Sequence, residues 1–303
     1  MRLAFCVLSV LILSSGPWAL GEGLTFSVAS FNVNNYRLEA SNTRKARSDA
    51  ARSRVAGAIG FSRPDIVGLQ EMGSPTALNS LRSELSRLGV EYPFSAFLDI
   101  ENQEIQCAVL SRFPILEDLS NHNQEFLLYG RAFKVLRGIM ELDIEISPGC
   151  HLRLINVHLK SRLPAWYADE SDYRLAEGQV LRQRIDQLLI ANSKMSLVVI
   201  GDLNDSPDSR VIRTVLGKGR TRLTDCRPRE KNLSVQQGKE RPSGISWTHH
   251  FERRDGYFRY DYILISPGLR PDWRSDLSHI PSYPFWQVAS DHRLIMASFG
   301  LEE

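Results

Sequence analysis

Clusters of Asn, Asp, Glu and His recur where apolar, strand-like runs of this sequence begin or end. They are SFNVNNY (30–36), GLQEM (68–72), INVHLKS (155–161), IGDLND (200–205), RYDYIL (259–264) and ASDHR (289–293). A turn or a solvated strand end explains any one of these clusters by itself. Six such clusters in one chain instead predict that the strand ends converge on one polar site.

The spacing within the clusters places polar side chains on shared strand faces. Side chains alternate along a strand, so Asn156, His158 and Lys160 share one face, as do Asp202 and Asn204. An unpaired carboxylate is costly to bury, and a divalent cation at a common site would offset that cost. Because the donors are hard oxygen atoms and no cluster contains Cys, the sequence favours Mg²⁺, Mn²⁺ or Ca²⁺ over Zn²⁺.

The elements that must position these clusters are eight strands and three helices. Apolar runs rich in Val, Ile and Leu predict strands at 24–33, 65–71, 105–111, 133–146, 151–160, 196–204, 260–266 and 293–299. Helices are expected at 44–60, 74–88 and 170–191, the last with an amphipathic stripe. This mixed α/β pattern fits two sheets packed face to face and covered by helices.

The motifs FNVNNY, LQE, NVHLKS, GDLND, RYDYIL and SDHR resemble, in order and spacing, those of the endonuclease/exonuclease/phosphatase superfamily with the DNase I-like fold. The resemblance runs from Phe31 to Phe299 and is to a secreted, bacterial-type member. It implies a four-layer α/β sandwich of two mostly antiparallel sheets flanked by helices.

The resemblance also implies a metal site. Glu71 corresponds to the main metal carboxylate, and Asn32 and Asp291 to supporting ligands, bound directly or through water. The implied cofactor is Mg²⁺ or Mn²⁺, with Ca²⁺ as an alternative. One-metal and two-metal mechanisms both remain open.

The catalytic roles follow from the same resemblance. His292 corresponds to the general base and Asp261 to the carboxylate that orients it, while Asp202 and Asn204 position the water and a phosphate oxygen. Whether His292 or Asp202 is the base stays open. His158, Arg137 and Asn32 are the implied contacts to the substrate phosphate, with Arg131 as a competitor for the role of Arg137.

The remaining features bound the location of the protein and its organisation. Residues 1–21 read as a secretory signal peptide, because Arg2 precedes a short apolar run that Ser14 to Pro17 break, and residues 22–303 are expected to form a single domain. We therefore expect a secreted or periplasmic monomer without an integral membrane span.

Charge and cysteine content add little about partners. The net charge is +2 at pH 7 and would be +1 without Arg2, so the whole chain exerts no strong pull on polyanions. Among the three cysteines beyond the signal, Cys107 is expected to be a buried thiol, and Cys150 with Cys226 is the candidate disulfide.

The catalytic set alone does not identify the phosphate ester. Basic residues at positions 37–54 and the aromatic, basic stretch 247–260 favour a nuclease with nucleic acid as partner. The aromatic loops 163–169 and 281–288 favour the alternative, a sphingomyelinase- or phospholipase C-like enzyme that binds a phospholipid head group. A phosphomonoesterase of the same fold, or a non-catalytic or toxin-like binding protein, are further alternatives.

Overall fold

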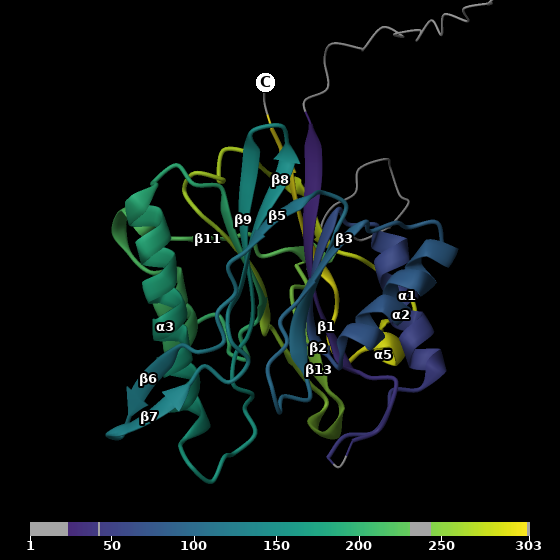
Figure 1. Cartoon of the computed structure of the whole chain (residues 1–303), viewed down its shortest axis with the longest axis horizontal. Helices are drawn as coiled ribbons and strands as arrows, with labels where there is room; N and C mark the ends of the chain where they lie inside the picture. Colours follow the sequence, from purple (N-terminus) through teal and green to yellow (C-terminus); the bar gives the residue numbers. More distant parts are fainter. Residues whose placement is uncertain (1–23, 42, 231–243, 302–303) are drawn as a thin grey trace, which may run out of the picture.

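The computed structural model describes residues 24–41, 43–230 and 244–301, which form two facing β-sheets with helices on both outer sides (Figure 1). In order across the first sheet, the strands are β12 (Arg229–Glu230), β16 (Trp273–Ile280), β17 (Ile295–Gly300), β1 (Thr25–Tyr36), β2 (Ile66–Met72), β4 (Gln106–Ser111) and β3 (Phe94–Phe97). In order across the second, they are β11 (Thr224–Asp225), β15 (Asp261–Ile265), β10 (Leu197–Asp202), β9 (Cys150–His158), β8 (Met140–Ser147) and β5 (Ile115–Asp118).

Helices form the two outer layers. The first sheet is covered by α1 (Asp49–Ser62), α2 (Pro75–Arg87) and α5 (Trp286–Ala289), and the second by α3 (Glu170–Ala191) and α4 (Arg210–Leu216). Two hairpins, β6 (Glu125–Leu128) with β7 (Arg131–Lys134) and β13 (His249–Phe251) with β14 (Gly256–Phe258), lie outside the large sheets. Short 3₁₀ turns occur at Gly219–Thr221 and Glu252–Arg254.

Strand direction agrees with the predicted fold. Three described pairs are parallel, β1 with β2, β9 with β10 and β12 with β16, and all other described pairs are antiparallel. The predicted sandwich of two mostly antiparallel sheets flanked by helices is confirmed.

Three apolar layers hold the four layers together. On β1, Phe26 and Val28 face the other sheet, while Ala29 and Phe31 face the helices. Strands covered on both faces need apolar residues at successive positions, which is why several of the predicted strands are apolar throughout. At about 25 cal/mol per Å² of buried apolar area, these layers supply most of the stabilisation of the fold.

The face between the sheets changes from apolar to polar toward one end. Along this face each strand replaces Val, Ile or Leu by a polar residue at its site end. The series are Val28, Ser30 and Asn32 on β1; Leu154, Asn156 and His158 on β9; Val198, Ile200 and Asp202 on β10; and Ile265, Ile263 and Asp261 on β15. Four strand ends therefore carry polar side chains into one region.

Two predicted elements differ from the structure. The strand expected at 133–146 is interrupted, because β7 ends at Lys134 and β8 begins at Met140, with a turn between them in which Gly138 has φ +62°. The helix expected at 44–60 begins at Asp49, where the Ser48 hydroxyl accepts a hydrogen bond from the Ala51 amide and caps the helix. Arg44, Lys45 and Arg47 consequently lie in a loop and not on a helix face.

The suggested disulfide was wrong, because Cys150 and Cys226 are free thiols. Cys150 is the first residue of β9. The Cys226 amide donates to the carbonyl of Ile263 on β15, and β15 is separated from β9 by β10. Neighbouring strands are about 4.8 Å apart, so residues on such strands are farther apart than the ~7 Å that a disulfide allows between Cα atoms. Cys107 is a buried thiol, as predicted.

The predicted signal peptide, residues 1–21, lies outside the described residues, and the domain assignment 22–303 stays a prediction. Within the described ranges, no helix combines the length and apolarity needed to cross a membrane.

Candidate active site

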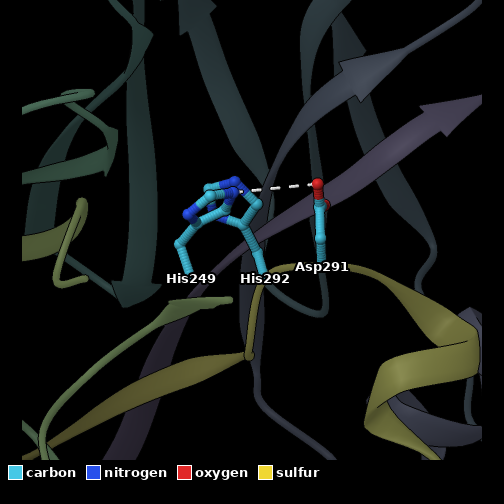
Figure 2. Close-up of side chains that lie close together, drawn as sticks. All are labelled: His249, Asp291 and His292. Atoms are coloured by element: carbon cyan, nitrogen blue, oxygen red, sulfur yellow. Dashed lines mark ion pairs between the residues drawn. The ribbon is translucent and has the colours of Figure 1, made fainter. Parts of the chain in front are cut away.

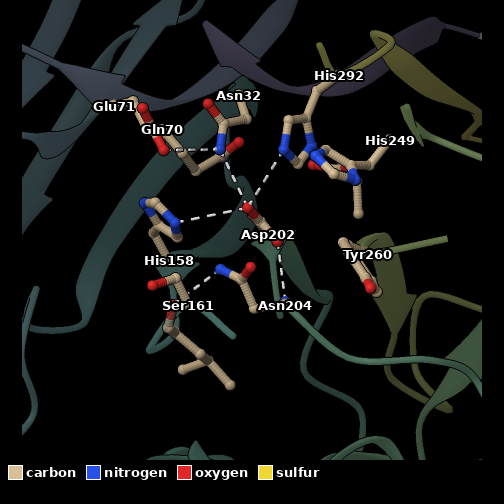
Figure 3. Close-up of polar contacts among 12 residues, drawn as sticks. Asn32, Gln70, Glu71, His158, Ser161, Asp202, Asn204, His249, Tyr260 and His292 are labelled. Carbon is tan, nitrogen blue, oxygen red and sulfur yellow. Dashed lines mark hydrogen bonds and ion pairs between the residues drawn. The ribbon is translucent and has the colours of Figure 1, made fainter. Parts of the chain in front are cut away.

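Asp202 lies at the centre of the polar end, where β10 stops. Its Oδ2 accepts a hydrogen bond from Asn32 Nδ2 at 3.0 Å and lies 3.5 Å from His158 Nε2 and 3.7 Å from His292 Nε2 (Figure 3). Its Oδ1 accepts the Asn204 amide at 2.8 Å. The carboxylate is buried, so these contacts replace the water that it loses.

His292 is held between two carboxylates. Its Nδ1 lies 2.8 Å from Asp261 Oδ2, which makes Nδ1 the protonated nitrogen and turns Nε2 toward Asp202. Two hydroxyls fix the backbone of this pair, since Ser290 Oγ accepts the His292 amide and Thr248 Oγ1 accepts the Asp261 amide. Asp261, His292 and Asp202 thus form a buried row with a defined orientation.

Burial and charge shift the pKa values of this row. Burial raises the pKa of Asp202 to about 7. Burial lowers the pKa of His292, but the charges of Asp261 and Asp202 outweigh it and raise that pKa to about 10. Without a cation, the Asp202–His292 pair therefore carries at least one proton at neutral pH, and the two titration steps belong to the pair as a whole. Burial, with the nearby charges of Arg137 and His292, keeps the pKa of His158 well below its usual value, so His158 is neutral.

Glu71 lies beside Asn32, and Asp291 lies beside His249 and His292. Glu71 Oε2 accepts the Asn35 amide at 2.9 Å, and Oε1 lies 3.5 Å from Asn32 Nδ2 (Figure 3). The backbone of Glu71 has φ +65°, a left-handed conformation that non-glycine residues adopt at a cost and that is common at functional sites. Burial raises the pKa of Asp291, but contact with His249 and the charge of His292 outweigh it and lower that pKa to about 2.

The residues at this end fit a hard divalent cation. Glu71 and Asp291 offer carboxylate oxygens, the donors that Mg²⁺ and Mn²⁺ prefer. Asn32 turns Nδ2 toward Glu71 and Asp202 and its Oδ1 accepts the Asn34 amide at 3.0 Å, so its amide would have to turn over to present oxygen to a cation beside Glu71. Among the described residues Glu71 forms no ion pair within 4.0 Å, although the nearby Arg47 is electrostatically coupled to both Glu71 and Asp291. A carboxylate without a direct cationic partner is available to bind a metal ion.

Two other predicted residues serve the site through the backbone. Asn204, with φ +53°, donates from Nδ2 to the carbonyl of Leu159 at 3.0 Å. Arg137 is buried, and its Nη1 donates to the carbonyls of His158 and Leu159 at 3.3 and 3.0 Å. Arg137 therefore holds the segment that carries His158, while its contact with a phosphate stays a prediction.

A sequence model of the Endonuclease/Exonuclease/phosphatase family matches residues 29–292. This chain belongs to that family. The family is one of metal-dependent phosphoesterases. Every residue of the site except Arg293 at its rim lies within the matched range.

Solved structures of the same fold agree. TDP2 from C. elegans has a TM-score of 0.60 at 18% identity, covering 92% of this chain and 76% of its own. Sphingomyelinase C from Streptomyces griseocarneus has a TM-score of 0.62 at 16% identity, and the match covers 91% of this chain and 100% of that protein. The human nocturnin catalytic domain with bound sulfate has a TM-score of 0.60 at 21% identity, and the match covers 92% of this chain and 96% of that domain. At these identities the likeness shows the fold alone. No curated protein matches the sequence.

Gln70 was not among the predicted site residues, and Asn156 was placed on a polar strand face without a role. Gln70 Nε2 donates to Asn156 Oδ1 at 2.7 Å, and Asn156 Nδ2 donates to the Leu69 and Ala108 carbonyls, so Asn156 joins the two sheets behind the site. The position of Gln70 beside Glu71 in the LQE motif was the sequence feature that could have indicated its place in the site.

Arg293 ends the SDHR motif but serves the rim of the site. It lies 3.3 Å from Glu230 and its guanidinium is 4.4 Å from the centre of the Trp247 ring. These contacts attach the segment after His292 to the stretch that precedes β13.

Proposed function

We propose that this protein is a divalent-cation-dependent phosphodiesterase that hydrolyses nucleic acid, DNA or RNA, as an endonuclease. The observation that carries the proposal is the buried Asp261–His292–Asp202 row, which Asn32 connects to Glu71 through contacts of 3.0 and 3.5 Å. A proton acceptor and a cation ligand thus flank the same amide side chain. That is the arrangement needed to activate water beside a phosphate.

The chain's own residues account for the proton and the nucleophile. A water placed at the Asp202–His292 pair gives its proton to the pair as its oxygen bonds to phosphorus, and the bond from phosphorus to the leaving oxygen breaks. Asp261 holds His292 Nδ1 and so keeps Nε2 directed at the reaction. His158, held by Arg137, and Asn204 border the space where a phosphate oxygen would lie.

The cation would be held by Glu71, Asn32 and Asp291. When bound, Mg²⁺ or Mn²⁺ supplies positive charge that offsets the negative charge developing on the phosphate and leaving oxygen.

Two surfaces beside the site support a nucleic-acid substrate. The loop after β1 carries Arg44, Lys45 and Arg47 near the Glu71 side, and basic groups of this kind contact phosphate backbones. On the His292 side, the β13–β14 hairpin exposes the rings of Phe251, Tyr257 and Phe258 to between 37% and 51%. Exposed rings next to a phosphate site suit the stacking of unpaired bases.

A different surface favours the alternative substrate, a phospholipid head group. Trp166 is 94% exposed and Leu163 72% exposed, and Tyr167 packs on Phe133 of the β6–β7 hairpin, where Leu127 and Tyr129 are also exposed. Such apolar tips can enter a lipid interface. The loop at 281–288 lies elsewhere. Its Phe285 packs under Arg54 of α1, and its Trp286 packs against Trp247, so it does not extend the apolar surface around Trp166.

A substrate panel tests the proposal. Plasmid DNA, RNA, sphingomyelin and a simple phosphomonoester would be assayed side by side with Mg²⁺, with Mn²⁺ and with EDTA. We expect cleavage of DNA or RNA that EDTA abolishes. Cleavage of sphingomyelin alone would replace nucleic acid by the phospholipid alternative, and release of phosphate from the monoester alone would replace it by a phosphatase.

We also propose that the protein is exported after removal of residues 1–21, on the strength of the charged and apolar pattern of that segment. N-terminal sequencing of the protein recovered outside the cytoplasm should begin at Glu22. Recovery of the full chain from the cytoplasm would contradict export.

A further inference from the structure

We propose that His249, Asp291 and His292 form a binding site for a transition-metal ion such as Zn²⁺, separate from the hard-cation ligands Glu71 and Asn32, and that occupancy of this site blocks hydrolysis. This inference concerns regulation, and its binding part does not depend on the proposed function. Among the six clusters that defined the predicted site, none includes His249.

The three donors lie close enough to share an ion. One ligand atom from each lies within 4.8 Å of the other two, and His249 Nε2 is 3.8 Å from Asp291 Oδ2 (Figure 2). Ligands around tetrahedral Zn²⁺, at 2.0–2.2 Å from the metal, are about 3.4 Å apart. Small side-chain rotations would close the difference, and one coordination position would remain for water.

His292 is prepared as a ligand by the same bond that prepares it as a base. Its Nδ1 is engaged by Asp261 at 2.8 Å, which makes Nε2 the nitrogen that a metal ion would bind, in place of the proton held there beside Asp202. A carboxylate behind a histidine in this way is the usual support of a metal-bound imidazole. The buried carboxylate of Asp202, 3.7 Å from Nε2, adds negative charge that favours a cation there.

His249 is positioned by ring packing and by the backbone. Its ring centre lies 5.2 Å from that of Tyr260 and 4.6 Å from that of His292, and its side chain is 14% exposed. A β-bridge joins residues 249 and 292, and the His250 amide donates to the Asp291 carbonyl at 2.9 Å. These contacts fix the hairpin strand against the segment that carries the other two donors, so the site needs little reorganisation.

The donor set decides the class of metal. Two imidazoles and one carboxylate suit Zn²⁺, Cu²⁺ or Ni²⁺, whereas Mg²⁺ prefers oxygen ligands. Asp291 is shared by this site and the hard-cation site. A Zn²⁺ ion here would take the lone pair of His292 that the reaction needs and withdraw Asp291 from the hard cation.

Direct metal binding tests the inference. The untagged chain, freed of metal, would be titrated with Zn²⁺ by calorimetry and with Co²⁺, whose visible absorption reports tetrahedral coordination. We expect one site, and His249→Gln should weaken it by at least ~10-fold, because changes even to groups that only support a ligand cost 10–100-fold. Asp291→Asn should weaken it as well, which provides a second variant if one folds poorly.

Two controls separate this site from others. His250→Gln changes the neighbouring histidine, which stacks on Tyr257 at 4.6 Å, and should leave Zn²⁺ affinity unchanged. Glu71→Gln should also leave it unchanged. Zn²⁺ affinity that is the same in His249→Gln as in the wild type, or that falls equally in either control, would overturn the proposal.

Inhibition provides the second readout. At saturating Mg²⁺, Zn²⁺ should inhibit the wild-type enzyme, and His249→Gln should need at least ~10-fold more Zn²⁺ for the same fractional inhibition. Tight Zn²⁺ binding without inhibition would retain the site and reject its regulatory role. If no substrate is cleaved, the proposed function fails while the binding titration still decides the site.

Discussion

The two ends of the layer between the sheets are built from the same strands but held in different ways. At one end Val28, Val198 and Ile265 pack as an apolar core. At the other, the same strands present Asn32, Asp202 and Asp261, which are buried to a similar degree. Apolar packing tolerates a change of partner of similar volume, whereas the polar end depends on individual hydrogen bonds.

Asn156 marks the boundary between the two ends. It follows Leu154 on the same strand face, and it bonds across to Gln70 and to the carbonyls of Leu69 and Ala108 on the other sheet. The close approach of the sheets here uses Gly68, where an added Cβ would lie 2.3 Å from Ile200 Cδ1. The apolar end therefore sets the distance between the sheets, and the polar end depends on that distance to hold its side chains within hydrogen-bonding reach.

The largest expected effect is the loss of catalysis at the polar end. His292→Ala removes half of the Asp202–His292 pair, so kcat should fall by ~10²-fold or more. The variant should be less stable than the wild type, because Asp261 and Asp202 lose their buried partner, so turnover is measured well below its unfolding temperature. Turnover would be measured by a DNA cleavage assay and folding by thermal unfolding, and near-normal turnover would remove His292 from its role.

A substitution that creates a cavity at the apolar end should have the opposite effect, lowering stability and sparing catalysis. Ile263→Ala on β15 lies on the same face as Asp261 and should lower the free energy of unfolding by about 2–5 kcal/mol. Activity well below the unfolding temperature should stay close to that of the wild type. Chemical denaturation measures the first effect, and a large loss of kcat in the folded variant would show that the two ends are not separable.

The polar end should also make the free energy of unfolding depend on pH. Burial raises the pKa of Asp202 to about 7 from the usual value of about 3.9, so the folded protein holds a proton over a range in which the unfolded chain has lost it. The free energy of unfolding of the metal-free protein should therefore fall as pH rises from about 4 to about 7. Asp202→Asn should reduce this fall.

Denaturation curves of both proteins in EDTA, recorded across this range, test that sign. Equal pH dependence in wild type and variant would show that Asp202 is not the group responsible.

The smallest effect is expected for an exposed pair that resembles the catalytic one. His151 Nδ1 lies 3.2 Å from Asp143 Oδ1, but the histidine side chain is 47% exposed and lies at the β8–β9 turn. His151→Ala should change stability by no more than about 1 kcal/mol and leave kcat unchanged. A large effect on either would mean that burial is not what distinguishes the His292–Asp261 pair.

Much of the fold was predictable because the sandwich needs apolar strands, and seven of the eight predicted runs correspond to single strands of the large sheets. The run at 133–146 was predicted as one strand because apolar residues lie on both sides of the turn at Gly138. Hydrophobic periodicity does not detect a turn whose neighbouring residues are buried. The start of α1 was misplaced because helix-forming residues precede Ser48, and only its capping bond sets the boundary.

The site was predictable where a residue type itself carries the chemistry, as in Glu71, Asp202 and His292. The roles of Thr248, Ser290 and Gln70 could not be predicted, because their partners are brought near only by the fold. Thr248 accepts the Asp261 amide, Ser290 Oγ donates to the Asn32 carbonyl, and Gln70 donates to Asn156. His249 is similar: the sequence places it 43 positions before His292, and only the bridge between the two segments brings their rings together.

The measurement that tests the central claim most directly is the rate of DNA or RNA phosphodiester cleavage by the metal-free chain, before and after addition of Mg²⁺ or Mn²⁺. The polar end, with Glu71, Asn32 and Asp291 beside the Asp202–His292 pair, predicts no cleavage in EDTA, full recovery on addition of either cation to the wild type, and no recovery in Glu71→Gln. Cleavage that persists in EDTA, or that returns fully in Glu71→Gln, would contradict the account.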